Sequence, residues 1–178
     1  MKTTVLKFFT LSAAIFAFST ISFGQSQSTA TADAGANIIT PISISNTQGL
    51  DFGDIVSQTN AFKVIMSASG SRTDGSGLTG DQSPLLSTDA GNQALFTIKG
   101  EEDYKFSVLL PTSIDLSASG VTGATDMEVN TFTSNLNAAN NILTGGSVDL
   151  SVGATLNVNG TQAAGVYEGS FTVTVAYE

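Results

Sequence analysis

The sequence contains no cysteine and no histidine. Without cysteine the chain forms no disulfide, so its core must hold the fold together, and a lipid anchor attached to cysteine is excluded. Without histidine, the Ser-His and Cys-His nucleophile pairs, the usual proton shuttle and the commonest metal ligand are absent. The chain also lacks a Ser-x-x-Lys pair and a G-x-S-x-G motif. We therefore expect a protein that is not an enzyme and binds no cofactor.

Basic residues are scarce, with six Lys and Arg against 15 Asp and Glu, a net charge of −9. Lys2 and Lys7 precede an apolar run over residues 8–23, and Ser22 and Gly24 supply the small residues that define a cleavage site. This pattern predicts a signal peptide over residues 1–24, cleaved between Gly24 and Gln25. A membrane anchor is the alternative, but the run is shorter than the roughly 20 strongly apolar residues that a span needs. We expect no permanent membrane span.

Cleavage would remove two of the six basic residues, which changes the net charge from −9 to −11. Such an acidic chain is an unfavourable partner for nucleic acid. Export would place the protein in the periplasm in transit, and then at the cell surface or outside the cell.

Beyond residue 37, apolar side chains recur at every second position, which is typical of strands with one face on a core and one in water. Clusters of Gly, Asn, Asp and Ser separate the runs, and helix signals are weak, with one turn at most over residues 135–142. The pattern predicts an all-β fold, an immunoglobulin-like antiparallel β-sandwich of about eight or nine short strands over residues 38–178. The apolar runs cover residues 42–44, 50–52, 62–66, 94–98, 104–110, 114–118, 127–129, 148–158 and 165–177.

The segment 165–178 is the most informative part of the chain. Its apolar residues alternate strictly up to the penultimate position, which predicts a strand that stays well formed to the terminus and is available to a partner. We expect the contacts with an assembly partner or chaperone to come from Gly165, Tyr167, Phe171, Val173, Val175 and Tyr177. The alternative is an ordinary last strand that pairs only within its own domain.

This carboxyl-terminal pattern resembles that of subunits assembled into bacterial pili by the chaperone–usher route. Residues 41–55, PISISNTQGLDFGDI, resemble the first-strand region of the spore-coat-U-like branch of those subunits. Residues 36–178 are similar to an uncharacterised family of exported bacterial domains with both signatures, although the cysteine pair common in pilus subunits is absent. The resemblance implies a sandwich that lacks one strand. A periplasmic chaperone fills the resulting groove, and the extension of the next subunit replaces it at an outer-membrane usher.

Residues 25–37 form an N-terminal extension in which small apolar side chains alternate with polar ones. About nine residues of it would span roughly 30 Å as a strand, enough to follow a sheet edge. We expect a possible donor strand here, which would bind by β-augmentation although its alanines fill only shallow pockets. A disordered stalk and a first strand of the domain's own sheet are the alternatives. The inward side chains of the donor strand would be Ala30, Ala32, Ala34, Ala36 and Ile38.

The longest stretch without strand signals covers residues 67–89 and contains Arg72, the only arginine. We interpret it as a solvated hairpin tip in which Arg72 pairs with Asp74. Asp74, Asp81 and Asp89 lie among Gly and Ser, but the ordered spacing of a calcium loop is missing, so we predict no metal site. Asp51-Phe52-Gly53 is interpreted as a strand end, with Phe52 buried and Gly53 in a turn.

These observations favour an exported, non-enzymatic structural subunit that assembles with copies of itself or related subunits into a surface fibre by strand exchange. The alternative is a self-complete secreted sandwich that binds a carbohydrate or a protein at the cell surface. Paired acids such as Glu101 and Asp115 are interpreted as solvated turn residues rather than as a hydrolytic pair.

Overall fold

The computed structural model describes residues 26–76 and 83–178, which divide into two units, residues up to 37 and residues 38–178. The predicted signal peptide and its junction at Gly24 and Gln25 lie outside the described residues. Residues 26–37 belong to no helix or strand and are exposed. Within the described ranges, no helix has the length and apolar character needed to cross a membrane.

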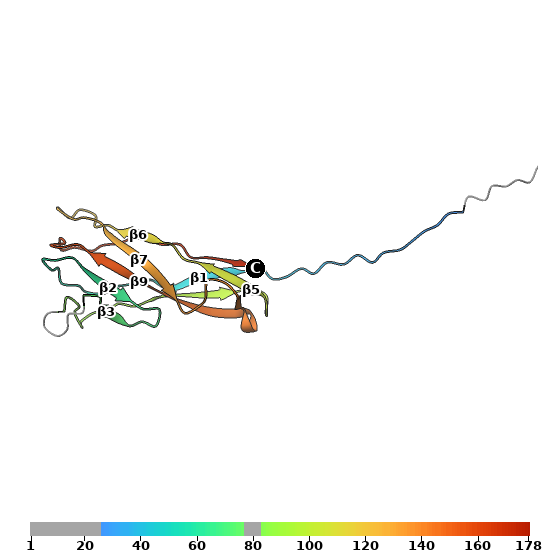
Figure 1. The fold of residues 1–178 in the computed structure, drawn as a ribbon, viewed down its shortest axis with the longest axis horizontal. Helices are drawn as coiled ribbons and strands as arrows, with labels where there is room; N and C mark the ends of the chain where they lie inside the picture. Colours follow the sequence, from blue (N-terminus) through green and yellow to red (C-terminus); the bar gives the residue numbers. More distant parts are fainter. Residues whose placement is uncertain (1–25, 77–82) are drawn as a thin grey trace, which may run out of the picture. The chain divides into compact units, whose positions relative to one another are not determined.

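Residues 38–178 form an antiparallel β-sandwich, which confirms the predicted all-β fold (Figure 1). The described part contains ten strands, slightly more than the sequence predicts, and one 3-10 turn, Thr144–Gly146. The strands are β1 (Ser43–Gln48), β2 (Phe62–Met66), β3 (Arg72–Asp74), β4 (Ala94–Lys99), β5 (Lys105–Leu109), β6 (Ser113–Leu116), β7 (Met127–Ser134), β8 (Asn141–Ile142), β9 (Ser147–Val158) and β10 (Thr174–Tyr177).

The larger sheet is organised around β9. Val152 pairs with Ala94 of β4 and with Ser134 of β7, so β4 and β7 lie on opposite edges of β9. Leu156 likewise pairs with β2 and with β7. The strands β4 and β2 therefore follow one another along one edge of β9, and β7 takes the other edge. β1 extends the sheet beyond β4, β3 extends it beyond β2, and β6 extends it beyond β7.

The smaller sheet has the order β10-β5-β8 and covers only part of the larger one. One core cluster contains Phe106 and Val108 of β5 packed with Ile98, Leu150 and other residues of the large sheet. The other cluster contains Phe52, Phe62, Met66, Met127 and Leu156, and receives no side chain from β5, β8 or β10. We call the half of the sandwich over the second cluster the open half, because no strand of the small sheet covers it, although the members of this cluster are buried beneath irregular segments.

Two segments differ from regular secondary structure. Residues 135–142, for which the sequence allows one helical turn at most, form a loop that leads into β8. The buried Asn141 side chain accepts from the Asn137 N–H at 3.1 Å and donates to the Asn137 carbonyl at 2.7 Å. This closes the loop, while the backbone of Asn141 pairs with Phe106.

The predicted strand over residues 165–178 exists only as β10, with one isolated bridge between Glu168 and Ser117. Residues 169–173 are paired with no other described residue in a ladder. A strand needs a neighbour to satisfy its backbone groups, and the alternating pattern does not reveal whether that neighbour is present.

We expect Leu150→Ala to lower the free energy of unfolding by about 2–5 kcal/mol, because it opens a cavity between the two sheets. Leu109→Ala is the matched control, since Leu109 also lies on a strand but is 68% exposed. Urea unfolding of the two variants measures the difference. Equal losses would contradict the assignment of Leu150 to the core.

Candidate functional site

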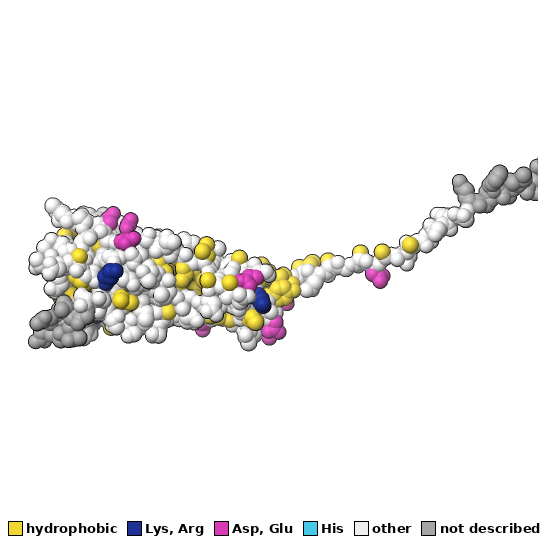
Figure 2. Space-filling view, in the orientation of Figure 1, with side chains coloured by type: hydrophobic (Ala, Val, Ile, Leu, Met, Phe, Trp, Pro, Cys, Tyr) yellow, Lys and Arg dark blue, Asp and Glu magenta, His cyan; other side chains and the backbone are white. Residues whose placement is uncertain are grey.

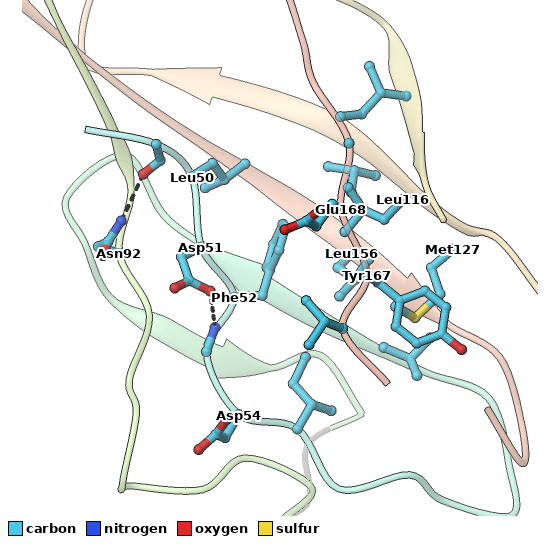
Figure 3. A pocket seen from close by; sticks show the side chains of 18 of the residues that line it. Leu50, Asp51, Phe52, Asp54, Asn92, Leu116, Met127, Leu156, Tyr167 and Glu168 are labelled. Atoms are coloured by element: carbon cyan, nitrogen blue, oxygen red, sulfur yellow. Dashed lines mark hydrogen bonds between the residues drawn. The ribbon is translucent and has the colours of Figure 1, made fainter. Parts of the chain in front are cut away.

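The open half of the sandwich forms a groove of about 1140 Å³ between two segments of the chain (Figure 3). We call residues 46–57 the first rim and residues 162–171 the second rim. The floor is apolar and is supplied mainly by the large sheet. The floor residues from that sheet are Phe96, Ile114, Leu116, Met127, Val129, Leu156 and Val158.

The first rim is paired on its outer side only. Asp51 and Asn92 exchange backbone hydrogen bonds at 2.8 and 2.9 Å, and the Val56 N–H donates to the Pro84 carbonyl at 2.8 Å. Because the backbone groups of an antiparallel strand alternate in direction, those of Leu50 and Ile55 point to the groove. Neither residue forms a backbone hydrogen bond with another described residue.

Gly53 bends the first rim and sends Phe52 inward. Its φ of 67° lies in the left-handed region, and a Cβ there would lie 2.4 Å from the Asp89 carbonyl oxygen. Phe52 is 7% exposed and packs against the floor, which confirms that Phe52 is buried and Gly53 turns the chain (Figure 3). The segment is not the end of a strand, since β1 ends at Gln48 and Asp51 forms only an isolated bridge.

Arg72 holds the first rim to the loop beside it. Its guanidinium donates to the carbonyls of Phe52 at 2.7 Å and Asp54 at 3.2 Å, and also to that of Leu86. The predicted pairing of Arg72 with Asp74 was wrong, since one Asp74 carboxylate oxygen accepts from the Ser76 N–H at 2.8 Å instead. Arg72 lies in β3, within the stretch that the sequence pattern assigns to a loop.

The second rim is also paired on its outer side only, through two 3.0 Å hydrogen bonds between Glu168 and Ser117. The backbone groups of Tyr167 and Gly169 therefore point to the groove. The Tyr167 side chain packs beside Met127, and its hydroxyl donates to the Ala163 carbonyl at 2.9 Å (Figure 3). A tyrosine that bonds back to the chain a few residues upstream is a feature of immunoglobulin-like sandwiches.

The rims meet at one end of the groove, where the Thr161 N–H donates to the Gln58 carbonyl at 2.7 Å and the Ser57 hydroxyl donates to the Gln162 carbonyl at 2.8 Å. At the other end β1 lies beside β10. The first rim runs toward the junction at Ser57 and the second runs away from it, so the rims are antiparallel. Between these ends, no hydrogen bond joins the two rims among the described residues.

Tyr177, at the end of β10, links the segment before β1 to the loop after β4. Its hydroxyl accepts from the Glu101 N–H at 2.6 Å and donates to the Thr40 carbonyl at 2.7 Å, while the Thr40 N–H donates to the Glu101 carboxylate at 2.8 Å. We call these three residues the clasp. The Thr40 N–H is the main reason that the pKa of Glu101 is lowered, because it stabilises the ionised carboxylate.

The predicted contact residues divide between the two halves of the sandwich. Gly165, Tyr167 and Phe171 line the groove, and Phe171 also packs against Phe132 at a centroid distance of 5.1 Å. Val173 and Val175 belong to the covered core, and Tyr177 belongs to the clasp. In the extension, Ala30, Ala32, Ala34 and Ala36 are exposed, as is Ile38. The pattern of apolar residues carries no sign that the first rim is half of a site.

The charged residues that line the groove are all acidic: Asp51, Asp54, Asp89 and Glu168. Asp51 and Asp89 accept hydrogen bonds from the Gly53 and Gly91 N–H groups, and Asp54 accepts one from the Thr88 hydroxyl. In the part of the chain that the structure describes, no three Asp or Glu residues gather as metal ligands would. Asp81 of the considered calcium loop lies outside that part. Uncharged side chains dominate the face of the domain shown in Figure 2.

We expect Arg72→Lys to loosen the first rim, because an ammonium cannot reproduce the fork that reaches three carbonyls. Loss of one or two of these bonds should cost about 1–3 kcal/mol. Hydrogen exchange would show faster exchange at the Val56 and Leu86 amides, which bond across this rim, than in the wild type. Exchange in the β4–β9 ladder should be unchanged, and an equal change there would contradict a local role.

We also expect the clasp to weaken in acid. The folded pKa of Glu101 is lowered, so its contribution to stability is present above the unfolded value of about 4.3 and is lost as pH falls through the folded value. An NMR titration of the Thr40 amide would follow this change. In Glu101→Gln the same amide should not respond over that pH range; an unchanged titration would contradict the role of Glu101.

Comparison with known proteins identifies one family. The model of a family described as a domain of unknown function, DUF4402, matches residues 42–177. No curated protein and no solved structure matches the chain. Because the matched residues include both rims, the floor of the groove and more than half of the sequence, the chain belongs to the DUF4402 family.

Proposed function

We propose that this protein is an exported, non-enzymatic structural subunit that receives an extended strand in its groove and assembles into a surface fibre by strand exchange. The observation that carries the proposal is a groove with an apolar floor between two antiparallel rims, each paired only on its outer side. A single added strand could bond to both rims and cover the floor. This is β-augmentation, in which backbone hydrogen bonds give affinity and alternate side chains enter pockets.

The floor supplies the driving force for such binding. Leu50, Phe96, Ile114, Leu116 and Phe171 remain only partly buried, although each packs against a core cluster. Covering apolar surface stabilises a complex by roughly 25 cal/mol per Å² before the costs of association. The apolar side chains of an inserted strand would gain this stabilisation on one face, and its polar side chains would stay in water.

We propose that the occupant in the fibre is the extension of another copy or of a related subunit. Residues 26–37 are exposed and belong to no strand, so their backbone groups are available. These 12 residues match the 12 residues of the first rim, each about 40 Å long when extended. Ala30, Ala32, Ala34 and Ala36 would face the floor.

The chemistry of the groove offers little support for catalysis. It contains no histidine or cysteine, since the chain has none, and no Lys or Arg lines it. The resemblance to chaperone–usher subunits adds a periplasmic chaperone as the earlier occupant and an outer-membrane usher as the site of exchange. Both partners are part of the proposal, as are export by the signal peptide and the final place at the cell surface.

The test compares inward and outward positions of the extension in the mature chain. Ala32→Asp with Ala34→Asp should abolish assembly, because each carboxylate would be buried on an apolar floor. Thr31→Asp with Gly35→Asp is the matched control: it adds the same charge at outward positions and should preserve assembly. Gel electrophoresis without boiling, together with electron microscopy, measures ladders and fibres.

Equal assembly by the two double variants would contradict insertion of the extension with this alternation. A wild-type chain that stays monomeric at all concentrations, with a thermal midpoint unaffected by either variant, would contradict strand exchange. That outcome would favour the alternative function, a self-complete sandwich that binds a carbohydrate or protein.

A further inference from the structure

The clasp lies where the extension joins the domain. Thr40 is held by both of its backbone polar groups, with its N–H donating to the Glu101 carboxylate and its carbonyl accepting from Tyr177. Pro41 follows and restricts Thr40 to extended conformations. The chain is therefore fixed at Thr40, and only residues before it are free to change direction.

This fixed point limits where the extension can reach in its own domain. If the chain turned back in a three-residue loop at residues 37–39, residue 36 would lie beside Thr40 and residue 30 beside Asn46. Residues 31–36 would then lie beside residues 40–45, which precede the first rim. Residue 26 would reach only Leu50, leaving the rim from Asp51 to Ser57 uncovered.

Release of the clasp would let the extension reach further. A three-residue loop of Pro41, Ile42 and Ser43 would place residue 40 beside Ile44, and Pro41 suits the first central position of the type I turn in such a loop. Ala32 and Ala34 would then lie beside Phe52 and Leu50 and face the floor with them. Residues 27–38 would follow the whole first rim of their own domain.

We propose that the clasp of Thr40, Glu101 and Tyr177 prevents the extension from filling its own groove, and so directs it to another copy. This inference rests on the proposed function and names the residues that select between exchange and self-insertion. Tyr177 and Glu101 act as positioning residues, since neither lines the groove.

Tyr177→Phe tests this directly, because it keeps the ring and removes only the hydroxyl that bonds to Glu101 and Thr40. The expected result is a shift from oligomers to monomers of roughly five- to thirtyfold at fixed concentration, as for the loss of one or two hydrogen bonds. Light scattering measures the monomer fraction. Tyr104→Phe is the matched control, since Tyr104 packs edge-on against Tyr177 but takes no part in the clasp, and it should assemble like the wild type.

A second measurement distinguishes monomers whose extension fills their own groove from monomers whose extension stays outside it. In the Tyr177→Phe monomer, adding Ala32→Asp and Ala34→Asp should lower the thermal midpoint, and that midpoint should be independent of protein concentration. Glu101→Gln removes the charge of the group that accepts from the Thr40 N–H and leaves Tyr177 unchanged, so it should weaken the clasp less. Glu102→Gln is its matched control because Glu102 is exposed. Circular dichroism confirms that each variant is folded.

The inference is overturned if Tyr177→Phe and Glu101→Gln assemble like the wild type. It is also overturned if their monomers have a midpoint indifferent to the two Asp substitutions, because the extension is then not in the groove. Failure of the proposed function has a different signature: the wild-type chain itself does not assemble, and its own midpoint is indifferent to those substitutions.

Discussion

A β-sheet can bury its apolar face only where a second layer covers it, and here the second layer is continuous over half of the core. Beneath β10, β5 and β8, Phe106, Ile98 and Leu150 are fully buried. Beyond them the central strand, β9, continues through residues 152–156, all of which are buried, but on the groove side only the two rims lie above it. The groove exists because the large sheet is longer than the layer that covers it.

Side-chain hydrogen bonds and one isolated bridge hold the rims in position, in place of the backbone ladders of a complete sheet. Arg72 uses its guanidinium to hold carbonyls of the first rim and of the neighbouring loop. The second rim depends on one isolated bridge to Ser117 and on the Tyr167 hydroxyl. At the ends, Ser57 and Gln162 join the rims directly, and Tyr177 secures the chain before β1. These fixed ends keep the rims apart in the middle without a strand between them.

The sequence predicts the parts of this fold that are decided locally. Strands β2, β4 and β9 follow from the alternation of apolar residues along the sequence. The expected wet face of β9 was wrong over residues 152–156, where both faces are buried. The short strands β3 and β8 were missed, because three and two residues carry no period and form only by pairing with β2 and β5. Tyr167 and Phe171 were found by pattern. The first rim was found only as a strand, because alternation shows which side chains are buried but not which edge lacks a partner.

The absence of cysteine connects the groove to the stability of the whole domain. With no disulfide to constrain the chain, the cluster beneath the rims, which contains Phe52 and Leu156, depends on noncovalent contacts. A strand that binds the folded domain and not the unfolded chain stabilises it by mass action, by about 2.7 kcal/mol when it is present at 100 times its dissociation constant. That is a substantial share of the roughly 5–15 kcal/mol by which domains are stable. An occupied groove therefore completes the core as well as linking two chains. Folding and assembly draw on the same apolar surface, and a change that weakens the floor weakens both.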